Sequence, residues 1–68
     1  MFLKFEQEKK SVYINTDKIV SIYQDVDNKT MITTVNPSEF YQVNQPIEEV
    51  LTTLRSRGLH IFSTIKNQ

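Results

Sequence analysis

His60 is the only histidine in this chain, and it is the first residue to consider for acid–base or metal chemistry. A catalytic histidine needs a nucleophile or an acid beside it, and a histidine that binds a metal needs further ligands. His60 lies in an apolar run without such neighbours along the sequence, and the chain has no cysteine to complete a metal site. We therefore interpret His60 as a surface or interface residue.

The acidic stretch Asp25-Val26-Asp27-Asn28 is similar to the start of a calcium-binding loop. Such a loop requires a glycine at its sixth position and a bidentate glutamate at its twelfth. Counted from Asp25, these positions hold Thr30 and Asn36, so neither requirement is met. The stretch is therefore predicted to be a turn between two strands.

Adjacent carboxylates at Glu48 and Glu49 are the remaining candidates for acid–base chemistry. Catalysis by paired carboxylates needs side chains that converge, whereas neighbours on a helix point in different directions. With one glycine in the chain, a glycine-rich phosphate loop is also excluded. We therefore expect a protein that is not an enzyme and that binds no cofactor or metal.

A helix over residues 46–57 is the element around which the fold is expected to be organised. Its apolar residues recur at the i, i+3, i+4 and i+7 spacing of a helix with one buried face; they are Ile47, Val50, Leu51 and Leu54. The positions between them are polar. This pattern predicts a helix that packs its apolar face on a sheet.

Both ends of this helix carry sequence signals. Pro46 suits the first helical position, because its φ is already helical and its missing N–H would have no partner there. Gly58 suits the left-handed position after the helix, from which Leu59 could fold back on the last turn. The N-terminal cap must come from Asn44 or Gln45, of which only asparagine is a preferred capping residue.

Five strands are expected before the helix, because β-branched and aromatic residues alternate with polar ones there. The predicted strands cover residues 2–6, 11–15, 19–24, 30–35 and 39–43. Within the third strand the apolar residues Ile19, Val20 and Ile22 break the alternation, which predicts a β-bulge or an offset start of the strand. The sequence therefore indicates a single α+β domain over residues 1–68, with an antiparallel β-meander packed by one helix.

The run from residue 59 to 65 is apolar and rich in β-branched residues, and it could add a sixth strand. As an edge strand it would be poorly protected against pairing with another chain. A chain of 68 residues without cysteine has a small core and no disulfides, so association is a common route to stability. We expect a homodimer whose contact surface includes Leu59, Ile61, Phe62 and Ile65.

The charges balance to zero but are unevenly distributed, because all eight acidic residues precede Val50. A zero net charge argues against tight, non-specific binding of nucleic acid. The basic residues near the C-terminus nevertheless define an alternative function, a regulatory protein that contacts nucleic acid through a basic edge. The residues of this edge are Arg55, Arg57, His60 and Lys66.

Several aromatic residues fall in the predicted strands and could form a platform on which bases stack; they are Tyr13, Tyr23, Phe40, Tyr41 and Phe62. Such platforms are interleaved with lysine and arginine, whereas this part of the chain is acidic. Packing in the core and across strands is therefore the preferred interpretation. An outer face that carries tyrosines would also suit protein binding.

The chain has no apolar run long enough to span a bilayer and no signal peptide, so we expect a cytoplasmic location without membrane insertion.

Three segments resemble the small bacterial FlbD/SwrD-type proteins: Tyr13–Ile19, Thr30–Thr34 and Tyr41–Val50. The resemblance covers residues 1–57, and it implies a cytoplasmic accessory protein of flagellar motility that acts through protein contacts. The Asn-Gly turns typical of that family are absent here, and residues 59–68 are an addition to it.

Overall fold

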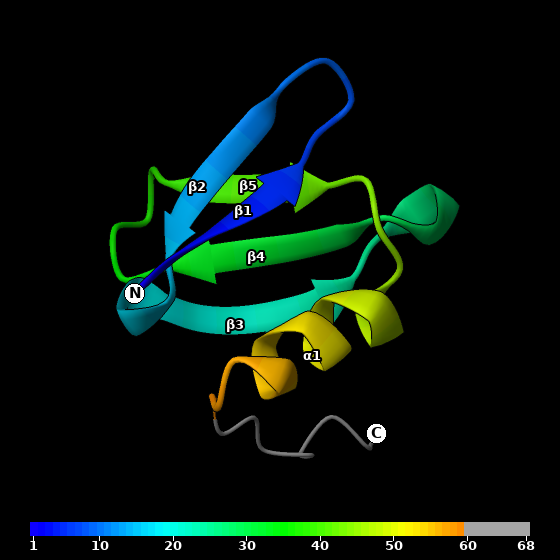
Figure 1. The fold of residues 1–68 in the computed structure, drawn as a ribbon. Coiled ribbons are helices and arrows are strands. Elements are labelled where there is room, and N and C mark those ends of the chain that lie inside the picture. The colour runs from blue at the N-terminus through cyan, green and yellow to red at the C-terminus, as the bar shows by residue number, and fades with distance from the viewer. Residues whose placement is uncertain (60–68) are drawn as a thin grey trace.

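The computed structural model describes residues 1–59, which contain five β-strands, two short 3-10 turns and one α-helix. In chain order the elements are β1 (Phe2–Glu6), β2 (Ser11–Asn15), η1 (Thr16–Lys18), β3 (Ile19–Gln24), η2 (Val26–Asn28), β4 (Thr30–Thr34), β5 (Phe40–Val43) and α1 (Ile47–Ser56). Figure 1 shows their arrangement. The expected α+β class, a strand-rich meander packed by one helix, is confirmed.

The strands form two antiparallel sheets rather than one continuous sheet. β1 pairs with β2 in a hairpin, and β3, β4 and β5 form a three-stranded meander in that order. The turn η1 separates the two sheets, because Asn15 Oδ1 accepts a hydrogen bond from the backbone N–H of Asp17 (3.1 Å) and turns the chain there. Side chains of this type commonly form such local bonds and interrupt a strand.

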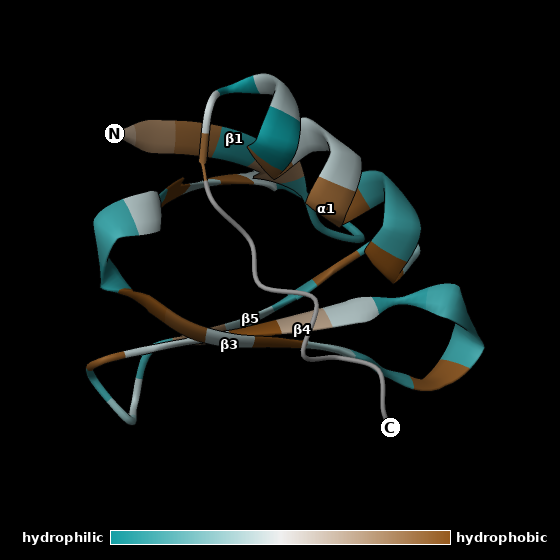
Figure 2. Cartoon of the chain, turned by 90° about the horizontal axis from the view of Figure 1, so that it is seen from below, coloured by the Kyte–Doolittle hydropathy of each residue, from teal (hydrophilic) through white to brown (hydrophobic). Residues whose placement is uncertain are grey.

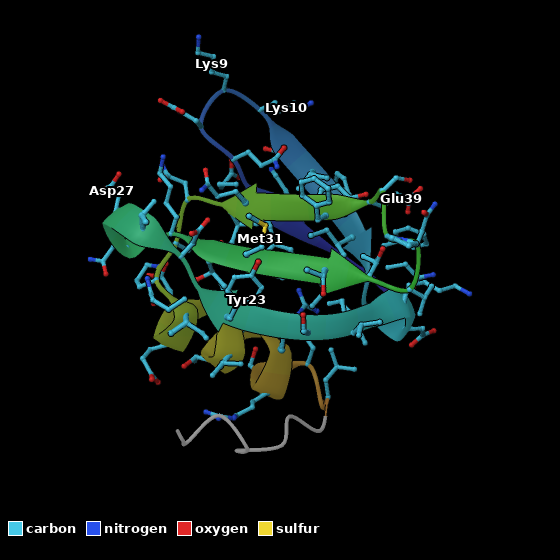
Figure 3. The ribbon with its side chains drawn as sticks, turned by 180° about the vertical axis from the view of Figure 1, so that it is seen from behind. Lys9, Lys10, Tyr23, Asp27, Met31 and Glu39 are labelled. Carbon is cyan, nitrogen blue, oxygen red and sulfur yellow. The ribbon has the colours of Figure 1, made fainter. Side chains whose placement is uncertain are left out.

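The two sheets and the helix form two layers around one core. Figure 2 shows α1 and β1 on one side of the molecule and β3, β4 and β5 on the other. The buried cluster between them takes residues from both layers: Leu3, Phe5, Ile14, Ile32, Val43, Val50 and Leu54. Figure 3 shows the opposite face of the three-stranded sheet, which points away from this core.

Polar contacts connect the layers, and two of them are short hydrogen bonds near the segment that leads into α1. The backbone N–H of Asn44 donates to the carbonyl of Glu6 (2.7 Å), which joins the end of β1 to the residue after β5. Thr30 is fully buried in β4, and its hydroxyl donates to the carbonyl of Gln45 (2.7 Å). Buried hydroxyls need such partners, so this bond fixes the segment that leads into α1.

The helix α1 buries the face that its sequence pattern predicts. Val50, Leu51 and Leu54 are buried, and Ile47 is half-buried at the first turn. The C-terminal end also agrees with prediction, because Gly58 has a φ of +82°. Its N–H donates to Arg55 (2.9 Å) and the N–H of Leu59 donates to the carbonyl of Leu54 (3.2 Å), the paired bonds of a Schellman motif.

The N-terminal end of α1 corrects the prediction in one respect. Pro46 occupies the cap position in an extended conformation (φ −69°, ψ 156°) instead of the first helical position. The side chain that accepts the Ile47 N–H is Gln24 Oε1 (3.2 Å), which comes from the end of β3. Gln45 instead donates to the Glu49 carboxylate (3.1 Å). Gln24, which is distant in sequence, thus provides the hydrogen-bond acceptor at the start of α1 that was expected from Asn44 or Gln45.

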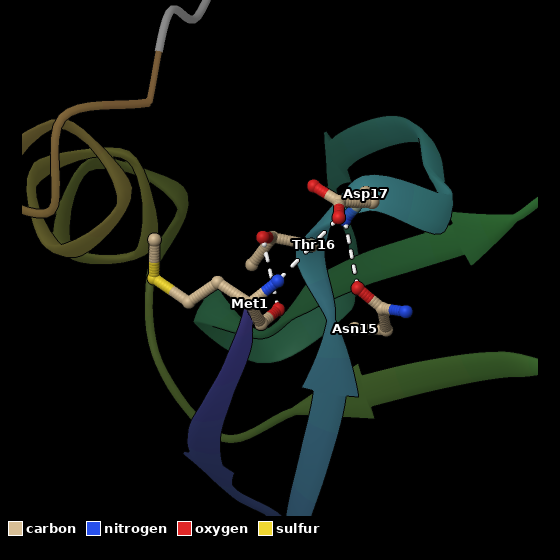
Figure 4. A network of polar contacts seen from close by, with 4 residues as sticks. All are labelled: Met1, Asn15, Thr16 and Asp17. Carbon is tan, nitrogen blue, oxygen red and sulfur yellow. Dashed lines mark hydrogen bonds and ion pairs between the residues drawn. The ribbon is translucent and has the colours of Figure 1, made fainter.

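The first residue is tied to the corner between the two sheets (Figure 4). The carbonyl of Met1 accepts hydrogen bonds from the N–H (2.8 Å) and the hydroxyl (3.1 Å) of Thr16. The amino group of Met1 also lies 3.5 Å from Asp17 Oδ2. This ion pair is exposed and contributes little to stability, so the backbone bonds are what hold the corner.

The described part of the chain contains no helix that is long and apolar enough to cross a lipid bilayer.

Candidate interaction surface

The side of the β3-β4-β5 sheet that faces away from the core presents a set of residues that we call the outer sheet face. Because side chains alternate along a strand, each strand contributes two residues to it. They are Ser21 and Tyr23 of β3, Met31 and Thr33 of β4, and Phe40 and Gln42 of β5. Figure 3 looks onto this face and labels Tyr23 and Met31 near its centre.

The strand register arranges these residues in two rows. Tyr23 lies opposite Met31, which lies opposite Gln42 on the next strand. In the second row Thr33 lies between Ser21 and Phe40. The hydroxyls of Ser21 and Thr33 share a hydrogen bond across the strands. The outer sheet face is therefore an array of aromatic, methionine, hydroxyl and amide side chains.

None of the six residues of the outer sheet face is charged. Its aromatic residues are accessible, with Phe40 60% exposed and Tyr23 49% exposed. The outer side of the β1-β2 hairpin differs, because there Lys4 lies 3.9 Å from the carboxylate of Glu6. The cores of protein interfaces are poor in charged residues and rich in tyrosine, phenylalanine and methionine. The outer sheet face has that composition.

A polar cluster lies at the end of the sheet where β3 turns into β4. Asp27 and Asn28 both have positive φ (55° and 59°), and the N–H of Lys29 donates to the carbonyl of Val26 (3.1 Å), as in a type I′ turn. Asparagine and aspartate tolerate this left-handed conformation better than most residues. The stretch that begins at Asp25 thus forms the turn that the sequence predicts between two strands.

The carboxylate of Asp25, at the end of β3, accepts a hydrogen bond from the far strand of the sheet, β5. Gln42 Nε2 of β5 donates to Asp25 Oδ2 (2.8 Å). This hydrogen bond, together with one from the Val26 backbone and the charge of Lys29, lowers the pKa of Asp25 below its ordinary value of 3.8. A carboxyl whose pKa is lowered by folding stabilises the fold at pH values above its pKa in the unfolded chain. That stabilisation is lost as the pH falls through its pKa in the folded protein.

Replacement of Gln42 by alanine is expected to raise the pKa of Asp25 towards 3.8, because the principal donor is removed. An NMR titration of the side-chain carboxyl carbon measures this directly. Gln45→Ala is the matched control, since its amide donates to Glu49 and not to Asp25. An unchanged Asp25 titration in Gln42→Ala would show that the backbone and Lys29 alone set the pKa.

The structure describes only part of the predicted contact surface and basic edge. Leu59 lies outside any strand and packs, partly buried, against the core. Arg55 and Arg57 are both exposed at the C-terminal end of α1. The other predicted residues of these surfaces lie outside the described residues: His60, Ile61, Phe62, Ile65 and Lys66.

The predicted aromatic residues divide between the core and the surface. Tyr41 packs against the core, whereas Tyr13, Tyr23 and Phe40 are exposed. Phe62 lies outside the described residues. Sequence reasoning anticipated an outer face with tyrosines but not its lack of charge. Uncharged residues do recur at every second position in the segments of β3, β4 and β5. That they form one uncharged face becomes clear only when the three strands are aligned.

Residues 1–59 bring together no group of three or more histidine, cysteine, aspartate or glutamate side chains that could hold a metal ion. No protein-family model, curated protein or solved structure matches this chain. The described residues form a small α+β protein with an accessible, uncharged sheet face.

Proposed function

We propose that this protein is a small, non-catalytic interaction module that self-associates by packing the outer sheet face against the same face of a second copy. The observation that carries the proposal is the absence of charge on a face that exposes Tyr23 and Phe40 around the half-buried Met31. Two stacked sheets that interdigitate aromatic and methionine side chains are a common way to bury such a surface.

A second copy suits this face because of symmetry. In a two-fold dimer the same patch occupies both sides of the interface, so the patch must be complementary to itself. A face with a net charge would meet its own charge across the axis, whereas an uncharged face does not. The whole chain also has a formal net charge of zero, so two copies do not repel each other at a distance.

Mutation of the outer sheet face to introduce a charge tests this proposal. We expect sedimentation velocity to show a dimer that dissociates on dilution for the unmodified chain. Tyr23→Lys should be monomeric at the same concentrations, because each copy would bury a lysine opposite the other copy. Tyr13→Lys is the matched control, since Tyr13 is 63% exposed on the outer side of β2 and outside the proposed interface.

Two results would contradict self-association through this face. One is an unmodified chain that sediments as a monomer at every concentration tested. The other is a Tyr23→Lys variant that dimerises as well as the unmodified chain, which would place the contact elsewhere.

The wider role that we propose is that of a cytoplasmic accessory protein of bacterial motility. It is supported by the similarity of residues 1–57 to the FlbD/SwrD-type proteins, including the Asn15–Asp17 turn and the paired acids Glu48 and Glu49 at the start of α1. Deletion of the gene should impair swimming or swarming, and restoration of the gene should recover it. A deletion strain that moves like its parent would contradict this role.

A nucleic-acid-associated regulator is the second candidate, favoured by the exposure of both Arg55 and Arg57 at one end of α1. Filter binding at low salt is the direct test, because contacts to phosphate are strongest there. Retention of DNA or RNA that is lost in an Arg55→Gln, Arg57→Gln double variant would support this candidate. No retention would remove it.

A further inference from the structure

The outer sheet face is small for the dimer that we propose, and the inference below rests on that proposed function. Three strands about 4.8 Å apart, with about five residues of 3.4 Å each, cover on the order of 250 Å² in projection. Each partner in a standard protein complex buries roughly 800 Å². A stable dimer therefore needs a second contact beside the outer sheet face.

The free edge of β3 is the nearest unsatisfied surface. β3 is a terminal strand of its sheet, and its six residues, Ile19–Gln24, include no proline and no charged side chain. Proteins usually protect edge strands with proline or charged residues. Within the strand itself the one protective feature is the β-bulge between Ile19 and Ser21, which leaves Val20 largely exposed.

The other edge of the same sheet, that of β5, is partly covered at one end. Beside β5, the N–H of Asn44 donates to the carbonyl of Glu6 (2.7 Å). The side chain of Gln7 also donates to the carbonyl of Gln42 (3.3 Å). The hairpin thus covers one end of β5, although no strand of residues 1–59 pairs with the outer edge of either β5 or β3.

The chain leaves the described region beside this edge. Gln24 at the end of β3 holds the first turn of α1 through the Ile47 N–H, and α1 then runs back along β3 in the opposite direction (Figure 1). Leu59 packs on the same core as Ile19 and Ile22 of β3. The described chain therefore ends at Leu59, on the same core as β3.

We infer that residues 60–66 of a second copy bind the free edge of β3 as an added antiparallel strand, and that the exchange is reciprocal. Seven extended residues reach about 23 Å, which exceeds both the length of β3 and the spacing of about 10 Å between stacked sheets. Addition of a strand to an open edge satisfies its backbone groups. Ile61 and Ile65 would share one face of that strand and cover the half-buried Ile19 and Ile22, and Phe62 would lie on its opposite face.

The direction of the strand favours the second copy over the segment's own chain. A segment that continues from Leu59 along its own β3 would run parallel to β3, because α1 is antiparallel to it. All the described strands pair in antiparallel fashion, and parallel pairing is slightly less stable per residue. A two-fold partner can enter from the opposite direction and extend the antiparallel sheet.

Disulfide trapping tests this inference cleanly, because the chain has no cysteine of its own. One preparation carries Val20→Cys on β3, and a second carries Ser63→Cys or Thr64→Cys. Adjacent residues of a strand point to opposite faces, so one of the latter two should face Val20 at a distance that a disulfide can bridge. Under mild oxidation we expect the mixed preparation to form a species of twice the chain mass.

The matched control replaces Val20→Cys by Tyr13→Cys, which is equally exposed but lies on β2. It should give only background cross-linking, and addition of Phe62→Asp to the Ser63→Cys or Thr64→Cys chain should abolish the mixed product.

The outcomes separate this inference from the proposed function. A third preparation carries both cysteines on the same chain. If it forms a disulfide within one chain while the mixed preparations form none, the edge belongs to the chain's own C-terminal segment, and the inference is overturned. A chain that dimerises through Tyr23 but gives no mixed disulfide would overturn the inference alone. A chain that stays monomeric would overturn both.

Discussion

Replacement of Phe5 by alanine is expected to lower the free energy of unfolding by about 3–5 kcal/mol. Phe5 is 1% exposed and is one of the hairpin residues in the cluster that joins both sheets to the helix. Domains are stable by about 0.05–0.15 kcal/mol per residue, or roughly 3–10 kcal/mol for a chain of this size. The loss is therefore about a third or more of the total stability, and urea unfolding followed by circular dichroism should show the midpoint of the variant at a much lower urea concentration.

Phe2→Ala is the matched control for this experiment. Phe2 lies on the same strand but is 63% exposed on its other side. Its replacement should change the free energy of unfolding by no more than about 0.5 kcal/mol, as for most surface substitutions. Equal losses in the two variants would mean that the hairpin does not pack on the sheet through the face that contains Phe5.

Replacement of Leu54 by alanine is expected to cost about 2–5 kcal/mol, the usual range for truncation of a buried leucine. Leu54 is 1% exposed and belongs to the same core cluster. Its carbonyl, which accepts the Leu59 N–H, is retained in the variant, so the loss reports side-chain packing and not the end of the helix. Thermal and urea unfolding should both show the loss.

Thr52→Ala provides the comparison on the exposed side of α1. Alanine has a higher helix propensity than threonine, so this variant should be as stable as the unmodified chain or slightly more stable. A Leu54→Ala loss below about 1 kcal/mol, well under the range for a buried leucine, would contradict the packing of α1 on the core.

The local elements of the fold could be predicted from sequence because their signals are local. The predicted ranges of the first three strands agree with β1, β2 and β3, and the break in alternation at Ile19 and Val20 corresponds to the observed bulge. Gly58 could be predicted to follow the helix, because the left-handed residue at that position is usually glycine. Each of these features depends on residues close together in the chain.

Features that depend on residues far apart could not be predicted. The capping of α1 by Gln24 requires that the end of β3 lie beside the helix, which no spacing in the sequence indicates. The division of the strands into two sheets has the same origin, because alternation shows which side of a strand is buried but not which strands pair. The uncharged outer sheet face likewise emerges only from the alignment of three strands.

The pairing of strands only with their sequence neighbours has a consequence for how fast the chain folds. Each ladder closes a short loop, so the conformational entropy lost before the first native contacts form is small. Chains dominated by such local pairings fold faster than those that must first join distant segments. The slow step should then be the docking of the first hairpin on the remainder, marked by the bond between Glu6 and Asn44.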